Sequence, residues 1–125
     1  MEEVRRQVVK DLLFAEPIIP EEGSLTGRIT KGAVQHYLAE IYLTLNKPDS
    51  TLFWSDKVVN NPAYALITQR YGVQADQDGV AFMDMFKAGN TNREEGNSEA
   101  LWVFQFKNNV LGGGEYPIMA MHHTS

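Results

Sequence analysis

Residues 30–62 constrain the fold more than any other part of the chain, because their pattern predicts two helices joined by a tight turn. In the first half, apolar residues recur at steps of three and four, which places them on one face of a helix. They are Ala33, Val34, Tyr37, Leu38, Ile41, Tyr42 and Leu45. Pro48 suits the first turn of a following helix. We therefore predict helices over about 30–45 and 48–60, packed as a hairpin.

A third amphipathic pattern precedes this hairpin and predicts a helix over residues 2–16. Pro17 and Pro20 follow it, and proline interrupts a helix. The apolar stripe of this helix consists of Val4, Val8, Val9, Leu12, Leu13 and Ala15. A loop over residues 21–28 leads from its end into the hairpin.

The hairpin follows the sequence pattern of a tetratricopeptide repeat. Leu38 and Ala39 fill the Leu-Gly/Ala pair of that pattern, and Tyr42 fills its aromatic position. Pro62 stands one residue before the expected closing proline. Residues 2–20 match the second helix of a preceding repeat, so the array begins in mid-repeat. Such repeats bury their apolar faces against neighbouring repeats, and we therefore expect the chain to self-associate or to expose an apolar patch.

Beyond Pro62 the pattern becomes irregular. A short helix is predicted over about 79–88, with Gly89 as its C-cap. A strand is predicted over about 100–106, where aromatic and β-branched residues are dense. Residues 64–67 and 116–121 are candidates for another short strand or packing segment.

The predicted fold class is therefore mainly α. Tetratricopeptide-like helical hairpin repeats occupy residues 1–62, and a short irregular α/β extension with one or two strands occupies residues 63–125. Together they are expected to form one truncated domain.

Charge and composition argue against several classes of function. The net charge is −5, and neither half of the chain carries a basic stripe, so nucleic-acid binding is not expected. The chain has no cysteine and therefore no thiol nucleophile or thiolate metal site. Residues 76–79 resemble the start of a calcium loop but lack the closing glutamate, which favours a simple turn. We predict no metal site and no cofactor.

The polar segment 92–99 is the part of the chain that most resembles a catalytic site. Two carboxylates that flank a sugar can hydrolyse a glycosidic bond. A general acid of that kind needs a raised pKa, and the neighbouring residues are polar and do not provide one. We therefore predict that the chain is not an enzyme, with a glycosidase as the less favoured alternative.

A glycine-rich loop is the strongest candidate for ligand binding. Gly112-Gly113-Gly114 is preceded by Asn108 and Asn109 and followed by Tyr116. Amides can hydrogen-bond sugar hydroxyl groups, and a tyrosine ring can stack on a pyranose. The competing interpretation is a plain surface turn. The remaining aromatic residues, including Tyr42, Trp54 and Trp102, have helical or strand spacing and are expected to belong mostly to the core.

Several segments, taken in order and spacing, resemble one known family. They read TKGA at 30–33, LAEIYL at 38–43, KVVNN at 57–61, YAL at 64–66, FMDMF at 82–86 and NSEALWV at 97–103, with Asn90 and Asn92 between the last two. This succession resembles the middle of a SusD/RagB-type outer-membrane lipoprotein and covers about residues 5–107.

The resemblance implies a cell-surface protein that captures oligosaccharides and delivers them to a TonB-dependent transporter of the SusC type in Bacteroidetes. It further implies a longer native protein with a signal peptide and a lipid anchor, neither of which occurs in this sequence, and a helical scaffold against the transporter. The alternative is a tetratricopeptide-type protein-interaction scaffold with no ligand of its own. Exposure of Trp54 and Tyr116 on one concave face would favour sugar binding, whereas burial would favour the scaffold.

Overall fold

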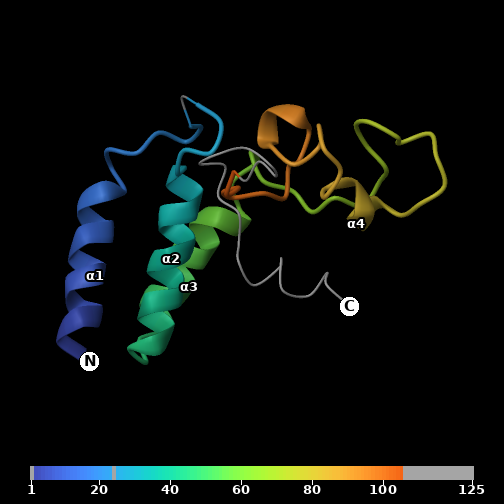
Figure 1. Ribbon diagram of the computed structural model, residues 1–125. Helices are drawn as coiled ribbons and strands as arrows, with labels where there is room; N and C mark the ends of the chain where they lie inside the picture. The colour runs from blue at the N-terminus through green and yellow to red at the C-terminus, as the bar shows by residue number, and fades with distance from the viewer. Residues whose placement is uncertain (1, 24, 106–125) are drawn as a thin grey trace, which may run out of the picture.

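The computed structural model describes residues 2–23 and 25–105, and within them it is mainly helical (Figure 1). Its helices are α1 (Glu2–Ala15), α2 (Lys31–Thr44), α3 (Pro48–Val59), the four-residue α4 (Ala81–Asp84) and the 3-10 helix η1 (Arg93–Glu95). No helix in these residues is long and apolar enough to cross a membrane. We call α1, α2 and α3 the helical layer, and residues 63–105 the extension.

The three long helices begin and end within a residue of where the sequence predicts. Thr30 is the N-cap of α2, and its Oγ1 accepts a hydrogen bond from the backbone N–H of Ala33 at 3.3 Å. Pro48 stands in the first turn of α3, where no intrahelical N–H bond is lost. Asn46, at φ 55°, makes the sharp turn between the two helices, so the predicted hairpin forms.

The apolar core lies between α2 and α3 and extends toward α1. Val34, Leu38, Ala39 and Trp54 are buried together. Half-buried side chains pack around them: Leu12, Ile19, Ile29 and Tyr42. In sequence order the helices lie side by side, α1 against α2 and α2 against α3 (Figure 1).

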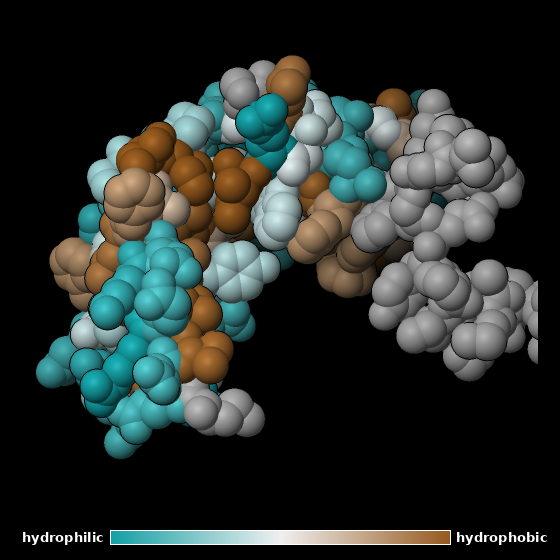
Figure 2. All heavy atoms as spheres, turned by 60° about the vertical axis from the view of Figure 1, so that its left-hand side comes forward, coloured by the Kyte–Doolittle hydropathy of each residue, from teal (hydrophilic) through white to brown (hydrophobic). Residues whose placement is uncertain are grey.

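Half of the stripe predicted on α1 is exposed. Val9 is 9% exposed and Leu12 packs against the core, whereas Val4 is 66% exposed and Val8 and Leu13 are also exposed. The reason is geometric, because α1 packs against α2 alone among the described helices. Apolar side chains therefore remain at the surface of the helical layer, as Figure 2 shows.

A polar contact holds the end of α1 against the other two helices. Glu16 accepts a hydrogen bond from Nε2 of Gln35 on α2 at 2.8 Å. Its carboxylate also lies 3.9 Å from Nζ of Lys57 on α3. The Lys57 ammonium in turn lies 4.9 Å from the centroid of the buried Trp54 ring.

The strand predicted over 100–106 is wrong for residues 100–105, which are irregular, and residue 106 lies outside the described residues. A strand needs a neighbouring strand, and here side chains bind its carbonyl groups instead. Arg93 donates to the carbonyl of Ala100, and Thr30 donates to that of Leu101. The carbonyl of Val103 likewise accepts from Gln105.

The other expected elements of the extension also differ from the structure. Residues 64–67 are not a strand: Ala65 pairs with Ser98 through one backbone bond of 3.1 Å and one bond from the serine hydroxyl. The helix predicted over 79–88 is reduced to α4, and Gly89, at φ 90°, lies in a turn rather than at a helix end. The candidate strand 116–121 lies outside the described residues.

Candidate functional site

The residues predicted to bind a ligand, Asn108, Asn109 and Tyr116, lie outside the described part of the chain. Among the other aromatic residues, Trp54 is buried and Tyr42 is half-buried against the core, as predicted. Trp102 is half-buried in an irregular segment. Two arrangements of polar residues are candidate sites. One is a buried cluster in the extension, and the other is a cleft between the extension and the loop before α2.

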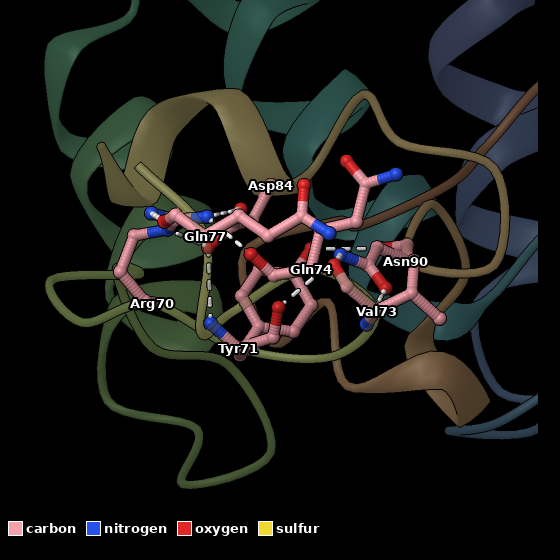
Figure 3. Close-up of polar contacts among 7 residues, drawn as sticks. All are labelled: Arg70, Tyr71, Val73, Gln74, Gln77, Asp84 and Asn90. Carbon is pink, nitrogen blue, oxygen red and sulfur yellow. Dashed lines mark hydrogen bonds and ion pairs between the residues drawn. The ribbon is translucent and has the colours of Figure 1, made fainter. Parts of the chain in front are cut away.

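The buried cluster centres on Asp84, whose side chain is fully buried at the end of α4 (Figure 3). Arg70 binds it through two bonds, Nε to Oδ2 at 2.7 Å and Nη2 to Oδ1 at 3.0 Å. The backbone N–H of Tyr71 donates to the same carboxylate at 3.0 Å. The hydrogen bond from Arg70 is the main reason that the pKa of Asp84 lies below its ordinary value.

Asn90 holds the same loop from its other side and is also fully buried. Its Oδ1 accepts from the N–H of Val73 at 2.8 Å, and its Nδ2 donates to the carbonyl groups of Tyr71 and Val73. The Tyr71 hydroxyl donates to the carbonyl of Asn90 at 2.7 Å. Gly72, at φ 65°, completes the turn, and a Cβ there would collide with the Asn90 amide.

Arg70 also donates from Nη1 and Nη2 to the carbonyl groups of Gln77 and Gln74. The groups of this cluster thus bind one another and the surrounding backbone, and they shape a loop (Figure 3). Sequence reasoning missed the cluster, since Arg70 and Asp84 are 14 positions apart and turns and bends fill most of the interval before α4. The glycine at 72 was the only local signal of a tight approach.

The cleft has a volume of about 440 Å³ and lies between two loops. Residues 22–23 and 25–28 line one side, residues 92–94 and 101–103 line the other, and the buried Thr30 contributes as well. This volume falls within the usual range for small-ligand sites, about 300–1,000 Å³. Sequence reasoning missed this site because its two sides are more than 60 positions apart.

Three hydrogen bonds tie the sides of the cleft together. The indole Nε1–H of Trp102 donates to the carbonyl of Gly27 at 2.8 Å. Thr30 Oγ1 donates to the carbonyl of Leu101 at 2.7 Å, and Thr26 Oγ1 donates to Glu94. These bonds therefore hold the two sides of the cleft in fixed positions relative to each other.

The charges on the cleft are balanced, two arginines against two glutamates. Arg28 and Glu22 are exposed on the first loop. Arg93 is half-buried: its guanidinium lies 4.3 Å from the Tyr64 ring centroid and donates to the carbonyl of Ala63 at 2.8 Å. The hydrogen bond from Thr26 holds the pKa of Glu94 below its ordinary value.

Within residues 2–23 and 25–105 no cluster of three or more histidine or acidic side chains is arranged to hold a metal ion. Residues 76–79 lie in a series of turns and bends, in line with the predicted turn. Comparison of the chain with protein-family models, with curated proteins and with solved structures finds no match.

Proposed function

We propose that the chain is part of a SusD/RagB-type glycan-binding protein, which captures oligosaccharides at the cell surface and delivers them to a TonB-dependent outer-membrane transporter. In this proposal α2 and α3 are a tetratricopeptide-like unit, and α1 is the second helix of a preceding one. The proposed function is binding without catalysis, and the proposed location is the outer membrane, through a lipid anchor on the longer protein.

One observation carries the choice of binding over hydrolysis: the carboxylates of the polar segment already serve as hydrogen-bond acceptors within the fold. Glu94 accepts from Thr26, and Glu95 accepts from the backbone N–H of Asn92 at 2.9 Å in a capping box. Glu99 accepts from the N–H of Ile67 at 3.0 Å. A glycosidase needs a carboxyl group with a raised pKa, whereas the pKa of Glu94 is lowered.

The asparagines that carry the family resemblance have a similar structural use. Asn90 and Asn97 are buried, and Asn97 Nδ2 donates to the carbonyl of Thr91 at 2.9 Å. Asn92 caps η1. In this proposal the polar bonds of the segment hold its shape, and the segment positions neighbouring loops for a ligand. The loop of Asn108, Asn109 and Tyr116 remains the proposed point of sugar contact.

Calorimetric titration of the chain with starch, mucin and plant oligosaccharides tests this function. We expect saturable binding by the native chain and a loss of affinity on Tyr116→Ala, because the ring would no longer stack on the sugar. Tyr37→Ala is the matched control, since Tyr37 is an exposed tyrosine on α2. A well-folded chain that binds none of these sugars would contradict the proposal for this part of the protein.

A second candidate function is a tetratricopeptide-type scaffold that binds a protein and no ligand. Two observations favour it: Trp54 is buried instead of exposed, and large apolar side chains remain exposed on both outer helices. Phe14 of α1 is 75% exposed, and Leu52 and Phe53 of α3 are also exposed. The scaffold would dock against the transporter or against a second copy of the chain.

Light scattering over a range of protein concentrations tests the scaffold. We expect the apparent mass to rise with concentration, and Phe14→Ser or Phe53→Ser to reduce that rise by removing exposed apolar surface. A chain that stays monomeric at high concentration and binds no apolar dye would count against self-association.

A further inference from the structure

We propose that the cleft lined by residues 22–23 and 25–28 on one side and by residues 92–94 and 101–103 on the other is itself a binding subsite for a neutral oligosaccharide. This inference rests on the proposed function. It assigns the sugar a place within the described residues, where the structure gives the geometry. Three features of the cleft support it: a fixed aromatic ring, a charge balance and exposed polar groups at the rim.

The aromatic ring is that of Trp102. Its only polar group, Nε1–H, is already bound to the carbonyl of Gly27. The Phe104 ring packs on it at 4.2 Å between centroids, tilted by 42°. These two contacts fix the orientation of a half-buried indole that lines the cleft. A rigid aromatic surface with its N–H satisfied suits apolar contact with the C–H face of a sugar.

The charge balance argues for a neutral ligand rather than an anion. A site for phosphate or a sugar acid normally has an excess of arginine or lysine, often in bidentate geometry. Here the carboxylates of Glu22 and Glu94 offset the guanidinium groups of Arg28 and Arg93. In addition, two nitrogens of Arg93 already donate to the carbonyl groups of Ala63 and Ala100.

The polar groups at the rim supply the hydrogen bonds that a sugar needs. Arg28 and Glu22 are exposed and project from the same loop, so they present five donors and two acceptor oxygens at one edge of the cleft. Sugar hydroxyl groups act as both donors and acceptors and can satisfy both side chains. The bonds across the cleft hold this loop in place, which lowers the ordering cost of binding.

The two tryptophans of the chain give a direct test by nuclear magnetic resonance. A ¹⁵N-labelled sample has two indole N–H signals, and Trp102→Phe identifies which belongs to the cleft. Titration with maltoheptaose, xylohexaose and a neutral mucin glycan should move the Trp102 signal, whereas the signal of buried Trp54 should stay in place. Hexagalacturonate, of similar length but acidic, should bind more weakly than the best neutral sugar.

Arg28→Ala tests the rim without disturbing the fold, because Arg28 is exposed. We expect roughly a fivefold loss of sugar affinity, the effect of about one hydrogen bond. Arg6→Ala is the matched control, an exposed arginine on α1, and should bind as the native chain does.

The outcomes distinguish this inference from the proposed function. A sugar that binds without moving the Trp102 signal, and with equal affinity to Arg28→Ala, overturns the cleft and leaves glycan capture standing. A preference for hexagalacturonate overturns the neutral ligand class. If no sugar binds to the folded chain, both the cleft and glycan capture by this part of the protein are overturned.

Discussion

The helical layer and the extension are stabilised by different kinds of contact. In the layer the largest fully buried side chains are Leu38 and Val34, and in the extension they are Asp84 and Asn90. Apolar burial stabilises through its summed area and has no direction. A buried polar group must be satisfied by particular partners. The layer should therefore respond to lost volume, and the extension to the loss of a single bond.

The largest effect is expected from Leu38→Ala in the layer. Leu38 is 0% exposed on α2, and its truncation removes apolar contacts and leaves a cavity between α2 and α3. Substitutions of this kind cost about 2–5 kcal/mol. Urea unfolding followed by circular dichroism at 222 nm measures the loss.

Leu43→Ala is the control, because Leu43 lies on the same helix and is 65% exposed. It should change the free energy of unfolding by about 0.5 kcal/mol or less. Equal losses in the two variants would mean that a partner chain covers the outer face of α2 in solution. The stability of the layer would then depend on that partner as well as on its own core.

In the extension the corresponding change is Asn90→Ala. It removes the acceptor for the N–H of Val73 and the donor for two carbonyl groups. Leaving a buried backbone group unsatisfied costs about 1–3 kcal/mol. Hydrogen exchange should show faster exchange at the amide of Val73, with the amides of α2 unchanged. Gln69→Ala, at an exposed position in the same region, is the control and should leave both rates as they were.

The same contrast explains how much of this fold could be predicted from the sequence. Apolar residues at steps of three and four identify a helix, so α1, α2 and α3 were found with accurate ends. The face that α1 buries depends on which helices lie beside it, and for that reason Val4 is exposed although it belongs to the predicted apolar stripe. Aromatic density at 100–106 suggested a strand, yet a strand also needs a partner, and local sequence does not show that Arg93 and Thr30 bind its carbonyl groups.

The candidate sites were harder to predict because no periodic pattern marks them. Arg70 meets Asp84 through turns, and Gly27 meets Trp102 although the two residues are 75 positions apart in sequence. Such long-range polar pairs arise from the three-dimensional path of the chain. The sequence instead predicted a site at the loop of Asn108, Asn109 and Tyr116, which lie outside the described residues.

Low pH should affect the two regions differently, because among the described residues the fully buried carboxylate, Asp84, belongs to the extension. Since the folded pKa of Asp84 is lowered, the carboxylate contributes its stability in full above its unfolded pKa. That contribution is lost as pH falls through the lower folded value. Between pH 5 and pH 2 the amide of Tyr71, which donates to Asp84, should lose protection, and Asp84→Asn should remove most of this pH dependence. Four other acids lie near Arg70 or Tyr71, namely Asp76, Asp78, Glu95 and Glu99, and their single amide variants are the controls.

The smallest of these effects is expected at Thr30, where the two regions meet. Its hydroxyl caps α2 by accepting from Ala33 and joins the layer to the extension by donating to Leu101. Loss of a threonine cap costs about 0.5–2 kcal/mol, so Thr30→Ala should lower the free energy of unfolding by about 1 kcal/mol. Thr44→Ala is the control, since Thr44 is exposed at the other end of α2, and its effect should be close to zero.

Thr30→Ala also tests whether the two regions unfold together. If the extension depends on the layer for its position, losing the bond to Leu101 should speed exchange at the hydrogen-bonded amides of Glu95 and Gly96 as well as in the first turn of α2. Faster exchange in α2 alone would show that the bond from Trp102 to Gly27 is sufficient to hold the cleft. In that case the extension would not depend on Thr30 for its position, and the cleft would keep its shape when the helical cap is lost.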